Sequence, residues 1–132
     1  MLDLGLLIVR LVIGLLFVGH GAQKLFGMFG GHGIKGTGGF FESIGVKPGV
    51  TMALLAGLAE FGGGLLFAAG LLTPVAALLI IFTMLIAIIK VHGANGLWAT
   101  NNGYELNLVY IVIALGAALT GAGSYSLDAI LF

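Results

Sequence analysis

Seven side chains in this sequence of 132 residues could bind or move charge, and they lie in or beside long apolar runs. They are Arg10, His20, Lys24, Glu60, Lys90, Glu105 and Asn107. Carboxylate, imidazole and ammonium groups that share one pocket can hold an anion or exchange protons with a bound molecule. Glu60 and His20 are the candidates for proton transfer, and all seven are candidates for ligand binding. The alternative for Lys24 and Lys90 is that they only extend toward the membrane surface.

The composition indicates that these groups belong to a membrane protein. Of the residues, 60% are hydrophobic and 8% are charged, whereas an ordinary soluble domain is roughly 25% charged. Ionisable groups inside a bilayer are costly and usually face the interior of a helix bundle. We therefore expect a multi-pass protein of the cell membrane, in contact with the lipid bilayer.

Several kinds of chemistry find no support in the sequence. There is no cysteine, so thiolate nucleophiles and C-x-x-C redox pairs are excluded, and a bound ligand must carry any electrons. The formal net charge is zero, which gives no electrostatic reason to expect a nucleic acid. The three histidines show no spacing typical of a metal site. No cofactor is assigned, although a quinone is one candidate.

The long apolar runs predict a single all-α domain over residues 1–132, built as a bundle of four transmembrane helices. A bilayer core of about 30 Å requires about 20 apolar helical residues. We expect helices at about 4–26, 51–72, 74–91 and 105–120. The glycine-rich loop 27–50 and the loop 92–104 should share one membrane face. Residues 39–44 predict a short interfacial helix, with Thr37 as its candidate N-cap.

Helical periodicity places the polar residues on small-residue faces. At 100° per residue, Arg10, Gly14, Gly21 and Lys24 fall on one side of the first helix. Glu60 lies near the middle of the second helix, about 18 Å from the face that holds the chain termini, and Arg10 lies about 9 Å from that face. A carboxylate at this depth must be paired or protonated, and we expect Arg10 to pair with it.

Most of the interior polar groups lie in the half of the membrane beneath the two long loops. If Lys24, Lys90 and His20 face one cavity with Glu60, that cavity is neutral to positive. It would suit a sulfur oxyanion, a phenolate or a quinone carbonyl that takes up a proton. The positive-inside rule favours these loops on the cytoplasmic side. If Lys24 and Lys90 are counted as site residues, however, the loop side keeps only Lys35 and Lys47 as basic residues, and the terminal side has Arg10.

Residues 31–36 match the spacing G-x-G-x-x-G, which in dinucleotide-binding proteins lies between a strand and a helix. Here the pattern follows a predicted membrane helix, so it does not predict a dinucleotide site. We expect its glycines to form a close-packed lid over the polar end of the bundle. His32 and Lys35 should lie at the rim of that lid.

Beyond these physical inferences, the sequence resembles the DoxX family of small four-helix membrane proteins. The stretches that carry the resemblance are residues 10–14, 19–27, 36–42, 59–64 and 120–128. The resemblance implies a redox-linked protein, as a subunit of a membrane oxidoreductase or of a complex that detoxifies oxidants, and it marks Arg10, His20, Lys24 and Glu60 as motif positions. Glu105 and Asn107 are marked more weakly.

Two functional hypotheses remain open at this stage. The first is a redox-linked protein that binds a quinone or a related anionic or phenolic molecule in the bundle. The second is a non-catalytic scaffold or small-molecule carrier that organises a partner protein. Whether the protein is an enzyme is open in both. Either hypothesis is compatible with a soluble oxidoreductase as partner and with a homo-oligomer.

Overall fold

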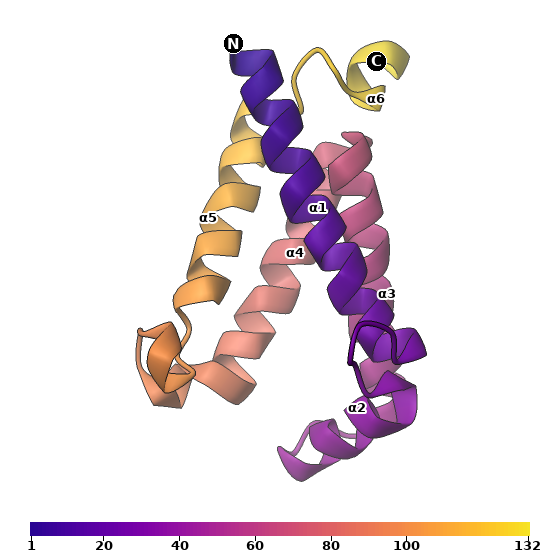
Figure 1. The fold of residues 1–132 in the computed structure, drawn as a ribbon, viewed down its shortest axis with the longest axis vertical. Coiled ribbons are helices and arrows are strands. Elements are labelled where there is room, and N and C mark those ends of the chain that lie inside the picture. Colours follow the sequence, from indigo (N-terminus) through magenta and orange to yellow (C-terminus); the bar gives the residue numbers. More distant parts are fainter.

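A computed structural model describes all 132 residues and contains helices and turns but no strand. Four long helices form the bundle: α1 (Leu2–Phe26), α3 (Gly49–Ala69), α4 (Thr73–Ala87) and α5 (Glu105–Thr120). The shorter α2 (Gly33–Ser43) lies at the end opposite the chain termini, which are near α6 (Leu127–Leu131) (Figure 1). The predicted all-α bundle is therefore confirmed.

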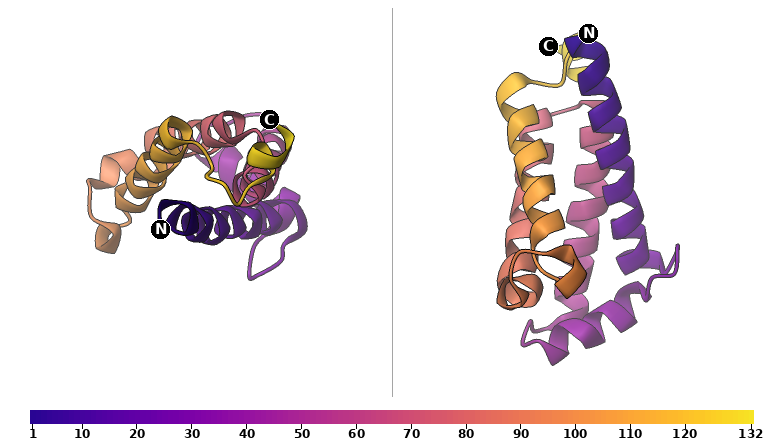
Figure 2. Two further views of the ribbon diagram at one scale, coloured as in Figure 1. Left: turned by 90° about the horizontal axis from the view of Figure 1, so that it is seen from above. Right: turned by 60° about the vertical axis from the view of Figure 1, so that its left-hand side comes forward.

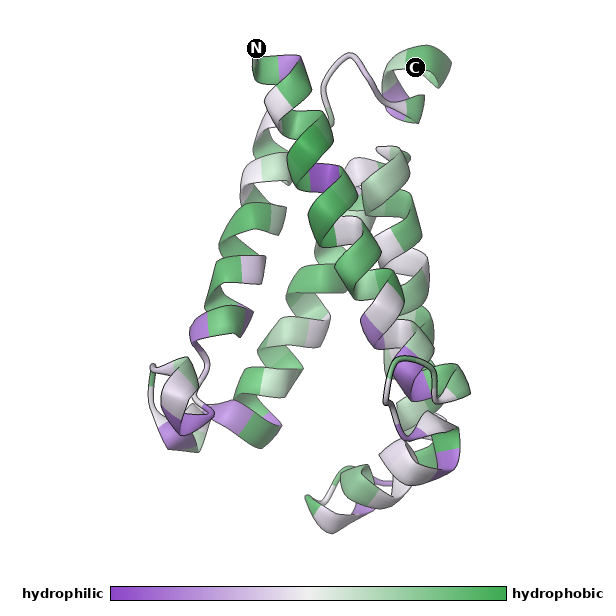
Figure 3. Ribbon diagram, viewed as in Figure 1, coloured by the Kyte–Doolittle hydropathy of each residue, from purple (hydrophilic) through white to green (hydrophobic).

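The apolar helices have the length that a membrane requires. The segments Leu2–Phe26, Gly49–Ala69 and Thr73–Asn95 are each long and apolar enough to span a bilayer, and α5 is a shorter apolar helix of 16 residues. Large apolar side chains face outward along them, among them Leu15, Leu78 and Val112, which are each more than half exposed. Figure 3 shows hydrophobic residues on most turns of the long helices. Such a surface is suited to lipid, and the protein is a multi-pass membrane protein.

The glycine-rich segment after α1 is more helical than predicted. The helix α2 begins at Gly33, so Thr37 lies inside it and is not its N-cap, a position that His32 occupies. One glycine of this helix contacts α3: a Cβ atom at Gly38 would lie 2.9 Å from the backbone of Val50. Glycine at position 38 therefore allows two backbones to approach closely.

The membrane helices form two pairs that diverge. Helix α1 packs along α3, α4 packs along α5, and the pairs are joined where α3 contacts α4. In Figure 1 the two pairs lie close together near the termini and separate toward α2 and the loop that precedes α5. Figure 2 shows both termini at the same end of the bundle. The bundle is thus closed at its terminal end and more open at its loop end.

Two pairs of glycines bring α1 and α3 together. A Cβ atom at Gly64 would lie 2.6 Å from the carbonyl oxygen of Gly14 and 2.7 Å from the amide nitrogen of Val18. About two turns further along α1, Gly21 and Gly57 permit a similar approach. A Cβ atom at Gly21 would lie 2.8 Å from the carbonyl oxygen of Gly57. In membranes such close packing of small residues drives the association of helices.

The terminal end is held by a set of hydrogen bonds that we call the clasp, made by Arg10, Asp128 and their partners. The carboxylate of Asp128 accepts hydrogen bonds from the amides of Leu72 and Thr73, at 2.7 and 3.0 Å, and from the Thr73 hydroxyl at 2.7 Å. It therefore caps the first turn of α4 from a distant part of the chain. The Asp128 amide donates to the carbonyl of Gly70 at 2.8 Å.

Arg10 belongs to this clasp, and its predicted pair with Glu60 is wrong. Its guanidinium group is 1% exposed and donates to the carbonyl oxygens of Ala68 and Tyr125. The direction of helical side chains explains the difference, since the Cα–Cβ bond tilts toward the helix N-terminus. Helices α1 and α3 are antiparallel, so Arg10 extends toward the terminal end whereas Glu60 extends toward the loop end.

The glycine contact between α1 and α3 predicts opposite effects for two neighbouring substitutions. Gly64→Ala places a methyl group against the backbone of α1, so it should lower the melting temperature of the protein in detergent. Gly62→Ala is the matched control, because no atom lies within 4 Å of its Cβ position. Since alanine favours helix by up to about 1 kcal/mol over glycine, this variant should be at least as stable as the original protein. Equal melting temperatures for both variants would contradict the packing described above.

The clasp predicts a loss of stability in acid. Partial burial raises the pKa of Asp128, but hydrogen bonds from Thr73 and Leu72, together with the Arg10 charge, hold it below its ordinary value. A carboxylate whose pKa is lower in the folded than in the unfolded protein stabilises the folded protein fully at pH values above its unfolded pKa of about 4. This contribution is lost as the pH falls through the pKa of the folded protein. Asp128→Asn should therefore lower the melting temperature at pH 7 by the equivalent of about 1 kcal/mol, because hydrogen bonds to a charged acceptor are stronger than those to a neutral one.

The difference between the original protein and Asp128→Asn should shrink as the pH is lowered below about 4. The control variant is Glu42→Gln, which removes an exposed carboxylate on α2. A gap in melting temperature that is independent of pH would show that the charge of Asp128 does not stabilise the clasp.

Candidate functional site

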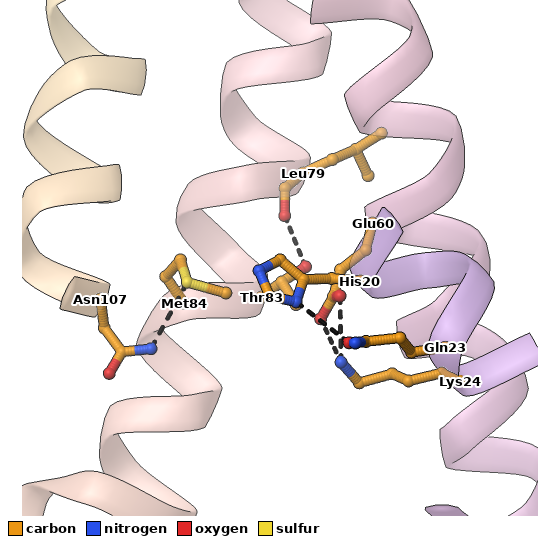
Figure 4. A network of polar contacts seen from close by, with 8 residues as sticks. All are labelled: His20, Gln23, Lys24, Glu60, Leu79, Thr83, Met84 and Asn107. Carbon is orange, nitrogen blue, oxygen red and sulfur yellow. Dashed lines mark hydrogen bonds and ion pairs between the residues drawn. The ribbon is translucent and has the colours of Figure 1, made fainter. Parts of the chain in front are cut away.

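An ion pair between Lys24 and Glu60 lies on the loop side of the bundle. The Nζ atom of Lys24 is 2.8 Å from Oε1 and 3.0 Å from Oε2 of Glu60. Glu60 is almost fully buried, whereas the Lys24 side chain is 26% exposed. Figure 4 shows the two side chains extending toward each other from α1 and α3. The pair satisfies the predicted requirement that a deep carboxylate has a partner.

Local sequence explains why these two residues meet. Lys24 follows Gly21, and Glu60 lies between Gly57 and Gly64, so both are on the glycine contact of α1 and α3. The tilt of helical side chains turns Lys24 back along α1 and turns Glu60 toward the loop end of α3. The same rule that separates Arg10 from Glu60 therefore brings Lys24 to it.

His20 and Gln23 extend the polar group along α1. The Nδ1 atom of His20 is 3.3 Å from Oε1 of Gln23, whose Nε2 donates to the carbonyl of Phe29 at 3.2 Å. Figure 4 places both side chains beside Lys24 and Glu60. The ring of Phe17 contacts the His20 ring edge to face, at 5.8 Å between centroids. These contacts orient the imidazole and tie the start of the 27–32 segment to α1.

A large cavity of about 1120 Å³ lies between α2, α3 and α4, and the ion pair forms part of its wall. The lining of this cavity includes polar side chains, those of Lys24, Glu60, Thr83, Lys90, His32 and His92. It also includes large apolar side chains, those of Phe40, Phe41, Ile44, Met52, Leu55, Phe82 and Ile86. The cavity therefore suits a molecule that has both a polar and an apolar part.

A small cavity of about 290 Å³ lies on the other side of the ion pair, between α1, α4 and α5. Its polar lining comes from His20, Lys24, Glu60, His92, Asn102, Asn107 and Tyr110. Lys24, Glu60 and His92 line both cavities. The Asn107 amide nitrogen lies 3.4 Å from the sulfur of Met84 (Figure 4). The ion pair thus lines two spaces, a large one with a mainly apolar wall and a small one to which several polar side chains contribute.

A π-helical turn at Ile88–His92 continues α4 and carries three lining residues of the large cavity, Lys90, Val91 and His92. The Nδ1 atom of His92 is 2.9 Å from the carbonyl oxygen of Asn102, which fixes the ring against the loop that precedes α5. Short π-helical segments inside α-helices are frequently found at functional sites.

The structure brings together five of the seven predicted site residues. Lys24 and Glu60 form the pair, His20 and Asn107 line the small cavity, and Lys90 lines the large one. Two residues lie elsewhere: Arg10 belongs to the clasp, and the Glu105 carboxylate accepts a hydrogen bond from the Ala99 amide at 3.0 Å. These two side chains therefore hold backbone segments in place.

Sequence reasoning did not place five polar lining residues of the large cavity in the site. These residues are Gln23, His32, Thr37, Thr83 and His92. His92 could have been found from its position two residues after Lys90, but an ordinary α-helix would place these residues about 200° apart. Gly30, Gly31 and Gly36 also line this cavity, whereas Lys35 is exposed and does not.

Comparison with known proteins identifies the fold family. The sequence pattern of the DoxX family matches residues 5–93, which include α1 to α4 and the π-helical turn. The chain belongs to the DoxX family. No solved structure matches this DoxX protein.

Several bacterial proteins are similar over nearly the whole DoxX chain. The inner membrane protein YqjF of Escherichia coli is 35% identical over 98% of this chain and 93% of its own length. The Bacillus subtilis protein named "Putative oxidoreductase CatD" is 33% identical over 98% of this chain and 89% of its own length. An uncharacterized membrane protein of Mycobacterium tuberculosis is 29% identical over 91% of this chain and 77% of its own length.

The buried ion pair predicts non-additive effects on stability. Lys24→Met leaves the Glu60 carboxylate buried without a partner and should destabilise the protein by on the order of 1–3 kcal/mol. This loss is smaller than for a fully buried ion pair because the Lys24 side chain is partly exposed to solvent. Lys24→Met combined with Glu60→Gln removes both charges and should restore most of the lost stability. The measurement is thermal unfolding of the original protein, both single variants and the double variant in the same detergent. Additive losses would show that the two charges do not interact.

Proposed function

We propose that this DoxX protein binds a quinone, or a related phenolic or small anionic molecule, with its oxygen-bearing end at the Lys24–Glu60 pair. The observation that carries the proposal is the position of this pair in the wall of a cavity that is otherwise lined largely by apolar side chains. An aromatic ring can pack against the apolar lining while its oxygen atoms bind the ammonium group of Lys24.

The pair offers both of the charges that such chemistry requires. A quinone carbonyl or a phenolate can accept a hydrogen bond from the Lys24 ammonium, and negative charge that develops on that oxygen is stabilised there. The Glu60 carboxylate can accept a proton from a hydroquinone hydroxyl or deliver one to a reduced oxygen. His20 and His92 lie close to the pair in the small cavity and can exchange protons with it.

In this proposal the side chains supply charge and protons, and the electrons pass between the ligand and a partner. The class of partner is a soluble oxidoreductase at the loop face, where both long connections lie. The name of the Bacillus subtilis relative, which describes an oxidoreductase, supports a redox role. The protein then acts as a membrane subunit of an oxidoreductase or of a complex that removes oxidants.

Ligand binding can be measured on the purified protein in lipid nanodiscs by quenching of the single Trp98 or by calorimetry. We expect saturable binding of a benzoquinone, with affinity at least tenfold weaker in Lys24→Met and Glu60→Gln. Glu42→Gln is the matched control, because it neutralises an exposed carboxylate on α2 that does not line the cavity. Absence of saturable binding for quinones, phenols and sulfur oxyanions alike would refute the proposal.

A second candidate function is that of a carrier or scaffold that performs no chemistry. One observation favours it: the Glu60 carboxylate is already bound by Lys24 at both oxygens, so the pair could serve only to join α1 and α3. Exchange of the charges in Lys24→Glu combined with Glu60→Lys separates the two functions. Retained oxidant resistance of host cells favours the scaffold, and loss of it in a stable protein favours chemistry at the pair.

A further inference from the structure

The large cavity has lining residues that also face the outside of the bundle at membrane depth. Phe82 on α4 is 66% exposed, Ile86 is 42% exposed, and Leu55 on α3 is 55% exposed, yet all three line the cavity. They belong to the segments Gly49–Ala69 and Thr73–Asn95, which are long and apolar enough to span a membrane. A side chain that is exposed and also lines a cavity marks a place where that cavity opens.

The packing of α3 against α4 explains this opening. Near the middle of the helices Gly63 fits against Leu79, since a Cβ atom at Gly63 would lie 3.1 Å from that of Leu79. Nearer the loop end, the cavity-lining residues of these two helices include Ala56, Ala59, Thr83 and Ala87. These side chains are too short to close the space between helices that diverge toward the loops (Figure 1).

The helix α2 does not close the opening. It packs against α1 and α3 but makes few contacts with α4. Its exposed Phe40 also lines the cavity, as do Phe82 and Ile86 of α4. The gap between α3 and α4 is therefore bordered by apolar side chains from three helices, and the polar pair lies further inside.

We infer that the gap between α3 and α4, which we call the lateral opening, admits a ligand from the lipid phase. The inference rests on the proposed function and names the substrate class: an amphiphile with an oxygen-bearing ring and a long apolar tail. The ring reaches Lys24 and Glu60, and the tail passes between Leu55, Phe82 and Ile86 into the bilayer. Because the border is apolar and the inner end is charged, a tailed ligand satisfies both ends at once.

A photoreactive ligand tests the direction of entry without altering the protein. The probe is a benzoquinone with a decyl tail that has a diazirine at its far end, added to the protein in nanodiscs and analysed by mass spectrometry. We expect the label on the part of α4 that contains Phe82 and Ile86, and its removal by excess unlabelled decyl quinone. Label on residues 28–37 instead, or label that excess quinone does not remove, would overturn the lateral opening.

A substitution in the opening provides the second measurement. Ala56→Phe places a large ring in the gap, and Leu115→Phe on the exposed face of α5 is the control. Affinities are compared for the decyl quinone and for the tail-free quinone with the same ring. Each affinity is calculated from the concentration of the quinone in the lipid, so that differences in partitioning do not affect the comparison. We expect Ala56→Phe to weaken the tailed ligand at least tenfold more than the tail-free one, and Leu115→Phe to leave both unchanged.

The outcomes separate this inference from the proposed function. Saturable binding of both quinones, with equal affinity and equal response to Ala56→Phe, overturns the lateral opening but leaves the quinone site standing. Absence of saturable binding for either quinone removes the proposed function itself. Displacement of the label by phospholipid alone would show that the opening holds a membrane lipid, and it would also overturn the inference.

Discussion

The ion pair of Lys24 and Glu60 is the constraint on which much of the structure depends. Glu60 is 3% exposed in a segment that lies in a bilayer, where an unpaired carboxylate is strongly unfavourable. Lys24 reaches it only because glycines on both helices allow α1 and α3 to approach closely. Larger residues at those positions would separate the helices and leave the carboxylate alone. The glycine pattern and the ion pair are therefore parts of one requirement.

The close contact of α1 with α3 also determines where the cavities form. One face of α3 packs against α1, and α4 contacts α3 through residues such as Gly63. At the terminal end Asp128 caps α4, and Arg10 binds the carbonyls of Ala68 and Tyr125. At the loop end no such bonds join the two helix pairs. The space that remains between them is lined by the ion pair, by small residues and by large apolar side chains.

The membrane helices could be predicted from the sequence because long apolar runs have few alternatives in lipid. The predicted range 105–120 agrees with α5, and the other three ranges differ from the observed helices by a few residues at their ends. The polar face of α1 was also predicted, but the partner of Glu60 was not. A helical projection places Arg10 and Lys24 on the same face, and only the opposite tilt of side chains on antiparallel helices distinguishes them. The π-helical turn that carries Lys90 and His92 has no signal in the apolar pattern.

The glycine-rich stretch after α1 shows how the walls of the large cavity are assembled. Gly31 lies against the backbone of Gln23, and Gly38 and Gly49 allow α2 to contact the start of α3. Helix α2 is thereby attached to the unit formed by α1 and α3, whereas Phe82, Lys90 and His92 belong to the unit formed by α4 and α5. Because the two units are joined at the terminal end, a small change in the angle between them alters the width of the cavity at the loop end. The lining residues of the large cavity therefore lie on both units, and the distance between them changes with the angle between the units.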